Sequence, residues 1–403
     1  MHTQKKGIKN MQETYICSYG RTPIGGFQGS LSKIPATKLG SIVIESILDN
    51  TLLPKDKINE VIMGNVLSAN LGQAPARQAA LGAGLPNNVE CMTINKVCGS
   101  GLKSIMLGDD GVRLNSDKII IAGGMENMSL APYYLNNSRT GMMFGDSKAI
   151  DSILKDGLWD PYNNQAMGNC AEVLNSDYNF SRKEQDEYAI ESYKRANNAI
   201  EKGYFKDEIV EVELESKKGI TNIKIDEEPL KFNEGKISQL RPTFDKNGTI
   251  TAANASSLSD GAAAVLLASK NNIEKYKLNP VAKIVSQASF AAEPLYFTKA
   301  PIYAIKNVLN KANLDINMID LFEINEAFSC VPMVAIKELG LDYRKVNIHG
   351  GGVSLGHPIG ASGARILVTL INALKINKMK YGIATLCIGG GEASAVLIEM
   401  CNK

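Results

Sequence analysis

Short apolar runs alternate with helical patterns along most of the chain, and this alternation constrains the fold more than any other feature. In the first part, strand-like runs at 14–25, 58–67 and 116–129 are separated by segments at 36–50 and 102–114, whose apolar residues recur at helical spacing. Strands that alternate with helices in this way predict an α/β fold with a largely parallel sheet.

The same alternation returns in the C-terminal third, after a middle segment of different character. The elements expected there are two helices and two strands, at 302–313, 361–375, 319–328 and 381–400. Between about Ser129 and Asn247 the alternation is lost, and Tyr, Asn, Met and Lys become frequent. We interpret this segment as an inserted domain, in which Ser181 and Glu184 form a capping box at the start of a helix.

Two stretches resemble each other and indicate an internal repeat. The segments "IIIAGGMENMS" at 119–129 and "ATLCIGGGEAS" at 384–394 both read as a strand followed by Gly-Gly-x-Glu. The segments "TINKVCGSGLKSIML" and "HPIGASGARIL" share a glycine-rich turn that opens onto a helix. Two copies of one such unit, facing each other, would form a layered and pseudo-symmetric body.

Composition excludes several classes of function. The net charge is only +2 over 403 residues, so neither nucleic acid nor an anionic membrane is expected as a partner. The seven cysteines are scattered without a CxxC pair, which is typical of a reduced, intracellular protein. With three histidines, a cluster of zinc ligands is not expected. The polar N-terminal segment lacks the apolar stretch of a secretory signal, and the cytoplasm is the expected compartment.

Cys98 lies in "CGSG", at a turn between an expected strand and an expected helix. Backbone N–H groups at a helix N-terminus lower the pKa of a thiol and can bind an oxyanion, and the glycines let a substrate approach. These features favour a nucleophile. The alternative is a small buried hydrophobic residue at a tight turn, because free cysteines are often buried.

A cysteine nucleophile usually needs a base, and the chain offers few histidines for this role. His2 lies in the N-terminal tail, which leaves His349 and His357 as candidates. His357 precedes Pro358 in a glycine-rich stretch that is typical of a rigid functional loop. His349 is consistent with a structural loop histidine, and both candidates stay open at this point.

Two further positions of interest lie near the ends of apolar strands. Cys387 precedes three glycines, and it is either a second thiol for acid–base chemistry or part of the core. Asn325, in "FEINEAFS", is either a helix N-cap or a group that orients a water or a histidine.

These motifs together resemble those of the thiolase family. The order Cys, Asn-Glu-Ala-Phe, Gly-His-Pro and Cys-x-Gly-Gly-Gly is highly specific, and the resemblance runs from about Thr14 to the C-terminus. The segments "RTPIG", "AGGMENMS", "TAANASSLSDGAA" and "GHPIGASGAR" are also similar to thiolase signatures. The segments "AAEPLYFTKAPIYAI" and 144–163 are most similar to the biosynthetic acetoacetyl-CoA thiolases, which are acetyl-CoA C-acetyltransferases.

The resemblance implies a five-layered αβαβα fold made of two pseudo-symmetric halves. The N-terminal half would comprise 10–128 and 249–278, and the C-terminal half 279–403. An inserted loop domain at 129–248 would bind CoA and mediate oligomerisation. The family also implies a homotetramer built from dimers, with the apolar loop at 130–150 as a tether between dimers.

The resemblance further implies a reversible ping-pong reaction that converts two acetyl-CoA into acetoacetyl-CoA and CoA. Cys98 attacks the first thioester and His357 takes its proton. Cys387 then deprotonates a second acetyl-CoA, which attacks acetyl-Cys98. One oxyanion hole would consist of His357 and a water held by Asn325, and the other of the backbone N–H groups of Cys98 and Gly389.

The family positions that contact CoA, and in some relatives a potassium ion, carry over to named residues. No cofactor is required beyond the CoA substrates. The CoA contacts would be Leu158, Met167, Tyr193, Lys231, Lys236, Ala252, Ser256, Ala327 and Phe328. A potassium ion would be held, mostly by backbone carbonyl oxygens, at Tyr193, Ala252, Ala253, Ala255 and Val353. Ala166 replaces a histidine that is usual in this class, which bears on CoA affinity and acyl selectivity rather than on the reacting groups.

Two other functions are consistent with parts of this pattern. A degradative 3-ketoacyl-CoA thiolase for longer chains would use the same reacting residues with a roomier pocket around Phe328 and 140–165. A non-catalytic CoA or lipid carrier of the same shape would have no need of the two cysteines, the histidine and the asparagine together.

Overall fold

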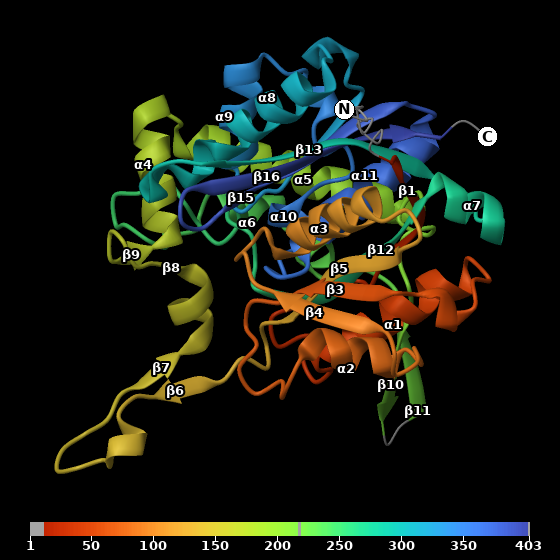
Figure 1. The fold of residues 1–403 in the computed structure, drawn as a ribbon. Helices are drawn as coiled ribbons and strands as arrows, with labels where there is room; N and C mark the ends of the chain where they lie inside the picture. The colour runs from red at the N-terminus through yellow and green to blue at the C-terminus, as the bar shows by residue number, and fades with distance from the viewer. Residues whose placement is uncertain (1–11, 217–218, 402–403) are drawn as a thin grey trace, which may run out of the picture.

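The computed structural model describes residues 12–216 and 219–401, and its centre is a ten-stranded sheet (Figure 1). His2 lies outside the described residues. The strands of the first half are β1 (Thr14–Arg21), β2 (Gly25–Gly26), β3 (Glu60–Gly64), β4 (Glu90–Ile94), β5 (Ile119–Asn127) and β12 (Ser259–Ser269). Those of the second half are β13 (Ala282–Ala291), β14 (Leu321–Ile324), β15 (Tyr381–Ile388) and β16 (Glu392–Met400).

The two halves of the sheet repeat one topology. In the first half, β1 pairs antiparallel with β12, β12 pairs antiparallel with β5, and β5 pairs parallel with β3. In the second half, β13, β16, β15 and β14 are joined by the same sequence of two antiparallel pairings and one parallel pairing. The halves meet where β1 and β13 pair over three residues. This repetition confirms the pseudo-symmetry that the sequence predicts.

The sheet is mixed, so the expectation of a largely parallel sheet is wrong. Among the pairings described in this sheet, β3/β4, β3/β5 and β14/β15 are parallel and the others are antiparallel. The segment at 381–400, expected as one strand, is a hairpin of β15 and β16, and consecutive strands joined by a tight turn run antiparallel. Gly390 and Gly391 in this turn have φ values of +92° and +88°, which glycine adopts readily.

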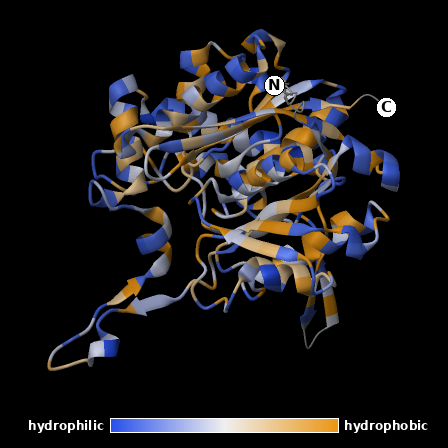
Figure 2. Cartoon of the chain, in the orientation of Figure 1, coloured by the Kyte–Doolittle hydropathy of each residue, from blue (hydrophilic) through white to orange (hydrophobic). Residues whose placement is uncertain are grey.

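Helices complete a five-layered αβαβα arrangement (Figure 1). In the central layer, α3 (Ser100–Leu114) and α11 (Ser362–Asn377) pack against each other between the two halves of the sheet. The outer layers are formed by α1 (Ala36–Asp49) and α2 (Pro75–Gly82) on one side and by α8 (Ala300–Ala312) and α9 (Cys330–Leu339) on the other. Figure 2 shows that apolar residues concentrate on the central strands and helices.

The two central helices approach each other closely at their first turns, where each carries a Ser-Gly pair. A Cβ atom on Gly101 would lie 2.7 Å from the backbone nitrogen of Ala364, and one on Gly363 would overlap the backbone nitrogen of Leu102. Neither position has room for a side chain, so glycine is required at both. This packing explains the repeated turn-and-helix pattern, and it brings the loops that precede α3 and α11 into the same region.

The segment between β5 and β12 holds elements that lie outside the large sheet. Its two-stranded sheets pair β6 (Tyr133–Leu135) with β7 (Ala149–Asp151), β8 (Trp159–Asp160) with β9 (Gln165–Ala166), and β10 (Val212–Ser216) with β11 (Gly219–Ile223). Its α-helices are α4 (Met167–Tyr178), α5 (Arg182–Glu201) and α6 (Glu234–Ile237). The capping box of Ser181 and Glu184 at the start of α5 is confirmed.

The buried apolar residues of this segment join clusters that also contain residues of the two halves, as Ala171 does with Ala304. The assignment of 129–248 as a CoA-binding and oligomerisation domain stays a prediction. Two short helices, α7 (Lys270–Tyr276) and α10 (Gly352–Leu355), complete the α-helices that the structure describes. Within residues 12–216 and 219–401, we find no helix with the length and apolar character needed to cross a membrane.

Candidate active site

Cys98 lies in a tightly bonded turn between β4 and α3. Val97 has a φ of +45°, an unusual conformation for a β-branched residue, and its N–H donates to the side chain of Asn95. The hydroxyl of Ser100 accepts a hydrogen bond of 2.8 Å from the backbone N–H of Lys96 and donates one of 2.7 Å to the carbonyl of Val97. These bonds fix the turn, and Cys98 lies partly exposed in the wall of a cavity.

The pKa of Cys98 is raised, because burial outweighs the expected lowering by backbone N–H groups. Burial raises the pKa of this thiol to about 11. The backbone N–H groups of Gly389 and of Cys98 itself hydrogen-bond to the sulfur and oppose the rise, but they do not outweigh the loss of water. Cys98 is therefore a neutral thiol at pH 7, and it needs a base in order to react. Both N–H groups point at the Cys98 sulfur, and the oxyanion hole predicted at these positions stays a prediction.

His357 lies in the loop between α10 and α11, and both of its ring nitrogens have partners. Nδ1 lies 2.5 Å from Oγ of Ser362, and Nε2 lies 3.4 Å from Nδ2 of Asn325. Burial, together with the positive charge of Arg365, lowers the pKa of His357 to about 3. The imidazole is therefore neutral at pH 7, the state in which it can accept a proton.

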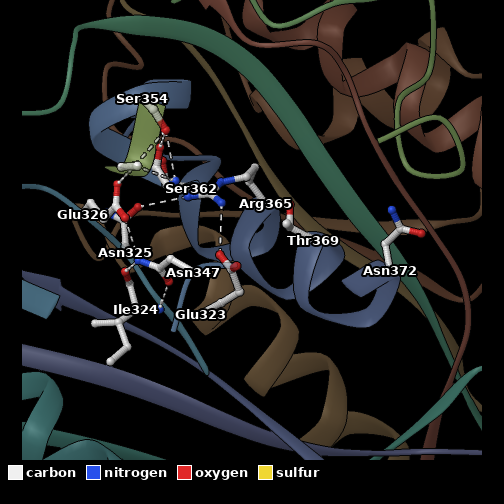
Figure 3. A network of polar contacts seen from close by, with 12 residues as sticks. Glu323, Ile324, Asn325, Glu326, Asn347, Ser354, Ser362, Arg365, Thr369 and Asn372 are labelled. Atoms are coloured by element: carbon white, nitrogen blue, oxygen red, sulfur yellow. Dashed lines mark hydrogen bonds and ion pairs between the residues drawn. The ribbon is translucent and has the colours of Figure 1, made fainter. Parts of the chain in front are cut away.

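Asn325 follows β14 directly, and its side chain is not a helix cap, because the N-cap position of α9 is Ser329. Its backbone N–H donates to the carbonyl of Thr385, and its Oδ1 accepts a hydrogen bond of 3.3 Å from Arg365. Figure 3 shows the Asn325 amide beside Arg365 in a buried polar network. The side chain lies 3.4 Å from the ring of His357, and its role in orienting that histidine or a water stays a prediction.

Cys387 is fully buried one residue before the end of β15. Burial raises its pKa well above the ordinary value, and the nearby Cys98 adds to the rise. Such a thiol is protonated at neutral pH, but the thiolate that it forms is a strong base. Cys387 is therefore part of the core, and its role in acid–base chemistry stays a prediction.

A cavity of about 350 Å³ with a largely apolar wall brings many of the predicted residues together. Its wall includes Cys98, His357 and Gly389, and also Leu158, Ala166, Met167, Ala252, Ser256, Ala327 and Phe328. A Cβ atom at Gly389 would lie 3.5 Å from Val97 and 3.6 Å from Met167, where it would occupy cavity space beside the thiol. Six of the nine predicted CoA contacts thus lie in this wall, and their role in binding stays a prediction.

Several predicted residues lie outside the cavity wall, namely Asn325, Cys387, Tyr193, Lys231, Lys236, Ala253 and Val353. Tyr193 stacks on Phe232 with 5.0 Å between ring centroids, and Lys231 forms an exposed ion pair with Glu228. Lys236 is exposed on α6, and the contact of both lysines with the nucleotide end of CoA stays a prediction. The positions predicted for potassium come from three elements, with Tyr193 on α5, Val353 on α10, and Ala252, Ala253 and Ala255 in the loop before β12. An ion at this place stays a prediction as well.

His349, the other histidine candidate, lies away from the cavity. It is buried beside the rings of Tyr204 and Phe205, with 5.1 Å and 5.9 Å between ring centroids. Burial lowers its pKa to about 4. The geometry therefore selects His357 as the histidine that shares a cavity with Cys98.

Glu326 is part of the "INEAFS" motif, and sequence analysis gave it no role. Its buried carboxylate accepts hydrogen bonds from Tyr188, Ser192 and Asn347 at 2.8–2.9 Å and from the backbone N–H of Val353 at 3.1 Å. These bonds hold the loop that carries Asn325 against α5 and α10.

Sequence analysis also missed a row of polar residues on α11. This row consists of buried polar residues on a largely apolar helix, namely Ser362, Arg365, Thr369 and Asn372 (Figure 3). Ser362 contacts His357, and Arg365 contacts Asn325. The spacing of three and four residues places the row on one face of the helix, and this spacing was the signal available in the sequence.

Comparisons with known proteins identify the family of the chain. The chain matches the model of "Thiolase, N-terminal domain" over residues 14–271 and that of "Thiolase, C-terminal domain" over residues 278–400. The chain belongs to the thiolase family. This thiolase is 49% identical over 396 residues to the acetyl-CoA acetyltransferase of Yarrowia lipolytica, and the match covers 98% of each chain.

Two solved structures have the same fold as this thiolase. It resembles the Acat5 thiolase of Ascaris suum, solved in complex with coenzyme A, with a TM-score of 0.92 and 44% identity. It resembles the human mitochondrial 3-ketoacyl-CoA thiolase with a TM-score of 0.94 and 36% identity. Each match covers 97% of this chain and 100% of the other. The protein is an acyltransferase, and thiolases use CoA thioesters as substrates.

Proposed function

We propose that this thiolase is an acetyl-CoA C-acetyltransferase, which condenses two acetyl-CoA to acetoacetyl-CoA and CoA in a reversible reaction. The observation that carries the proposal is the apolar cavity that ends at Cys98, His357 and Gly389. Curated relatives at 46–49% identity, which are named acetyl-CoA acetyltransferases, support this choice of substrate.

The first half-reaction transfers an acetyl group to Cys98. The thiol gives its proton to Nε2 of His357, and the thiolate attacks the carbonyl carbon of acetyl-CoA. The C–S bond to CoA breaks, and the departing CoA sulfur takes the proton of Cys387. The products are acetyl-Cys98, free CoA, a protonated His357 and a Cys387 thiolate, so every proton is accounted for.

The second half-reaction uses the two charges that the first one leaves. The Cys387 thiolate removes a proton from the methyl group of a second acetyl-CoA, whose carbanion attacks the carbonyl carbon of acetyl-Cys98. The Cys98 sulfur leaves and recovers its proton from His357. Negative charge on the acyl oxygen develops next to the N–H groups of Cys98 and Gly389, which suits an oxyanion hole.

The substrate range tests this proposal against a degradative 3-ketoacyl-CoA thiolase. We expect CoA-dependent loss of acetoacetyl-CoA with a kcat/KM at least about tenfold above that for a 3-keto substrate with four to six more carbons. The reason is that the rings of Phe244, Phe297 and Phe328 take up part of the cavity wall, where Phe328 packs edge-to-face against each of the other two. Initial rates over a series of chain lengths provide the measurement.

The other outcomes of this series have clear meanings. A preference for the longer chain would move the protein to the degradative class, which the similarity to the human 3-ketoacyl-CoA thiolase keeps as the second candidate. Binding of CoA without cleavage of any substrate would favour the carrier. Phe328→Ala serves as the matched variant, since opening the wall should raise the relative rate with the longer chain.

We further propose a homotetramer in which the loop at 130–150 joins dimers. Figure 2 shows an apolar tip on the segment between β6 and β7, which projects from the body. Met143 and Phe144 at this tip are almost fully exposed, and large exposed apolar groups commonly mark interaction sites. Multi-angle light scattering should give about four times the chain mass, and about half of that for the pair Met143→Ser and Phe144→Ser. Leu114→Ser, which changes an equally exposed residue on α3, is the control, and a monomeric native protein would refute the proposal.

A further inference from the structure

A buried row of hydrogen bonds connects an ion pair to His357. Nη1 of Arg365 lies 3.3 Å from Oε2 of Glu323, and Nη2 lies 3.3 Å from Oδ1 of Asn325. Nδ2 of Asn325 in turn lies 3.4 Å from Nε2 of His357. All four side chains are buried, so water does not compete freely for these bonds.

The chemistry of these groups fixes the direction of each bond. A guanidinium group can only donate, so Asn325 must present its oxygen to Arg365 and its NH₂ group to His357. The NH₂ group also only donates, so Nε2 of His357 must accept. The ring proton of a neutral His357 then resides on Nδ1, which donates to Oγ of Ser362. The hydroxyl of Ser362 passes its own hydrogen to the carbonyl of Pro358, 3.0 Å away.

We propose that Arg365 is a positioning residue, which acts through Asn325 to select the tautomer of His357 that has an unprotonated Nε2. Selection of this tautomer prepares the base that Cys98 requires. The inference rests on the proposed function only in giving His357 the role of base. The tautomer itself is a property of the resting protein.

The bonding of Arg365 argues against a purely structural ion pair. Arg21 is also a buried arginine that pairs with carboxylates. It donates three hydrogen bonds of 2.6–2.9 Å to the side chains of Glu208 and Asp226. Arg365 makes one contact of 3.3 Å to each of its two partners, and its Nε has no hydrogen-bond partner among the described residues. A buried charge with incomplete bonding is costly, and such groups are found where function requires them.

The positive charge of Arg365 and its hydrogen bond to Asn325 both favour an unprotonated Nε2 on His357. The titratable and charged groups around His357 come from several elements. They are Arg365 on α11, Glu323 on β14, Glu326 in the loop after β14, Cys98 in the turn before α3, Cys387 on β15 and Glu126 near the end of β5. Of these, Arg365 is the positive group, and its charge lowers the pKa of His357. Loss of that charge raises the pKa of His357, so protonation would disable the base at a higher pH.

The tautomer can be read directly, because the chain has only three histidines. Protein labelled with ¹⁵N-histidine is expected to show one imidazole with a protonated Nδ1 and an unprotonated Nε2, which disappears in His357→Asn. In Arg365→Gln we expect this signal to shift toward the other tautomer or to a mixture. Thr369→Val, one turn along α11, removes a buried hydrogen bond to Glu208 without touching Asn325, and it should leave the signal unchanged.

A pH profile provides the second readout. For Arg365→Gln we expect kcat to fall about 100-fold, and the acid limb of kcat/KM to move to higher pH. Arg365→Lys keeps the positive charge and a donor, so it should restore the acid limb of the native protein. A uniform loss of rate with an unchanged pH profile would assign Arg365 a structural role and overturn the proposal.

The native protein alone can also overturn the proposal, should any variant fail to fold. If the resting His357 is protonated on Nε2, the hydrogen bonds from Arg365 through Asn325 to His357 cannot run in the direction that the proposal assigns to them. A correct tautomer in a protein that cleaves no acyl-CoA would instead leave this inference standing and refute the proposed function.

Discussion

Replacing Cys98 with serine is expected to lower the rate of CoA-dependent acetoacetyl-CoA cleavage by at least about 10³-fold. A hydroxyl group has a far higher pKa than a thiol, and His357, whose own pKa is lowered to about 3, is too weak a base to ionise it. Even the thiol depends on proton transfer during attack, because burial raises its pKa to about 11. Initial rates of both proteins, measured at saturating acetoacetyl-CoA and CoA, provide the comparison.

The same variant should still bind CoA with nearly native affinity. The cavity wall is largely apolar, and exchanging one sulfur for oxygen changes little of its surface. Isothermal titration with CoA therefore separates loss of chemistry from loss of folding. Cys91→Ser is the matched control, because Cys91 is a partly buried thiol on β4 that lies outside the cavity wall. A Cys98→Ser rate within tenfold of the native rate would exclude Cys98 as the nucleophile.

The order of helices and strands was largely predictable from the sequence, because their periodicity is a local property. The apolar spacing at 36–50 and at 361–375 predicts helices that the structure has as α1 and α11. Strand direction was less predictable, since it depends on partners that are distant in the chain. The turn between β15 and β16 is formed by Gly389–Gly391. Because apolar residues continue on both sides of this turn, the sequence pattern indicates one strand rather than two.

The reacting groups were predictable in identity, but their electrostatics were not. Burial can outweigh the lowering of a thiol pKa by nearby N–H groups, and the degree of burial around Cys98 depends on the packing of both halves. The contact of Arg365 with Asn325 likewise joins α11 to β14 across 40 residues of sequence. A row of polar residues on a buried helix indicates that such partners exist, but not which residues they are.

Replacing Cys387 with serine is expected to separate the two chemistries of the site. Cleavage of acetoacetyl-CoA should fall by at least about 10³-fold, because the departing carbanion of acetyl-CoA needs a proton that a serine hydroxyl donates poorly. Exchange of labelled CoA into acetyl-CoA should fall by no more than about tenfold. This exchange passes only through acetyl-Cys98. In the native protein the departing CoA sulfur takes the proton of Cys387, but CoA is a thiol of pKa near 8.5, so in the variant it can leave as a thiolate.

The ratio of the two rates decides whether Cys387 is the acid–base group. Cys330→Ser is the matched control, since Cys330 is an equally buried thiol of the same apolar cluster, whereas Cys387 is the buried thiol whose pKa the nearby Cys98 raises. That variant should lose stability, because a hydroxyl is buried in place of a thiol, yet keep the native ratio of exchange to cleavage. Equal losses of exchange and cleavage in Cys387→Ser would show that the thiol supports the fold of the site rather than the carbanion step. A selective loss of cleavage would instead assign to this buried thiol the proton that the carbanion exchanges, because exchange can proceed with Cys98, its base and the two N–H groups when CoA leaves as a thiolate.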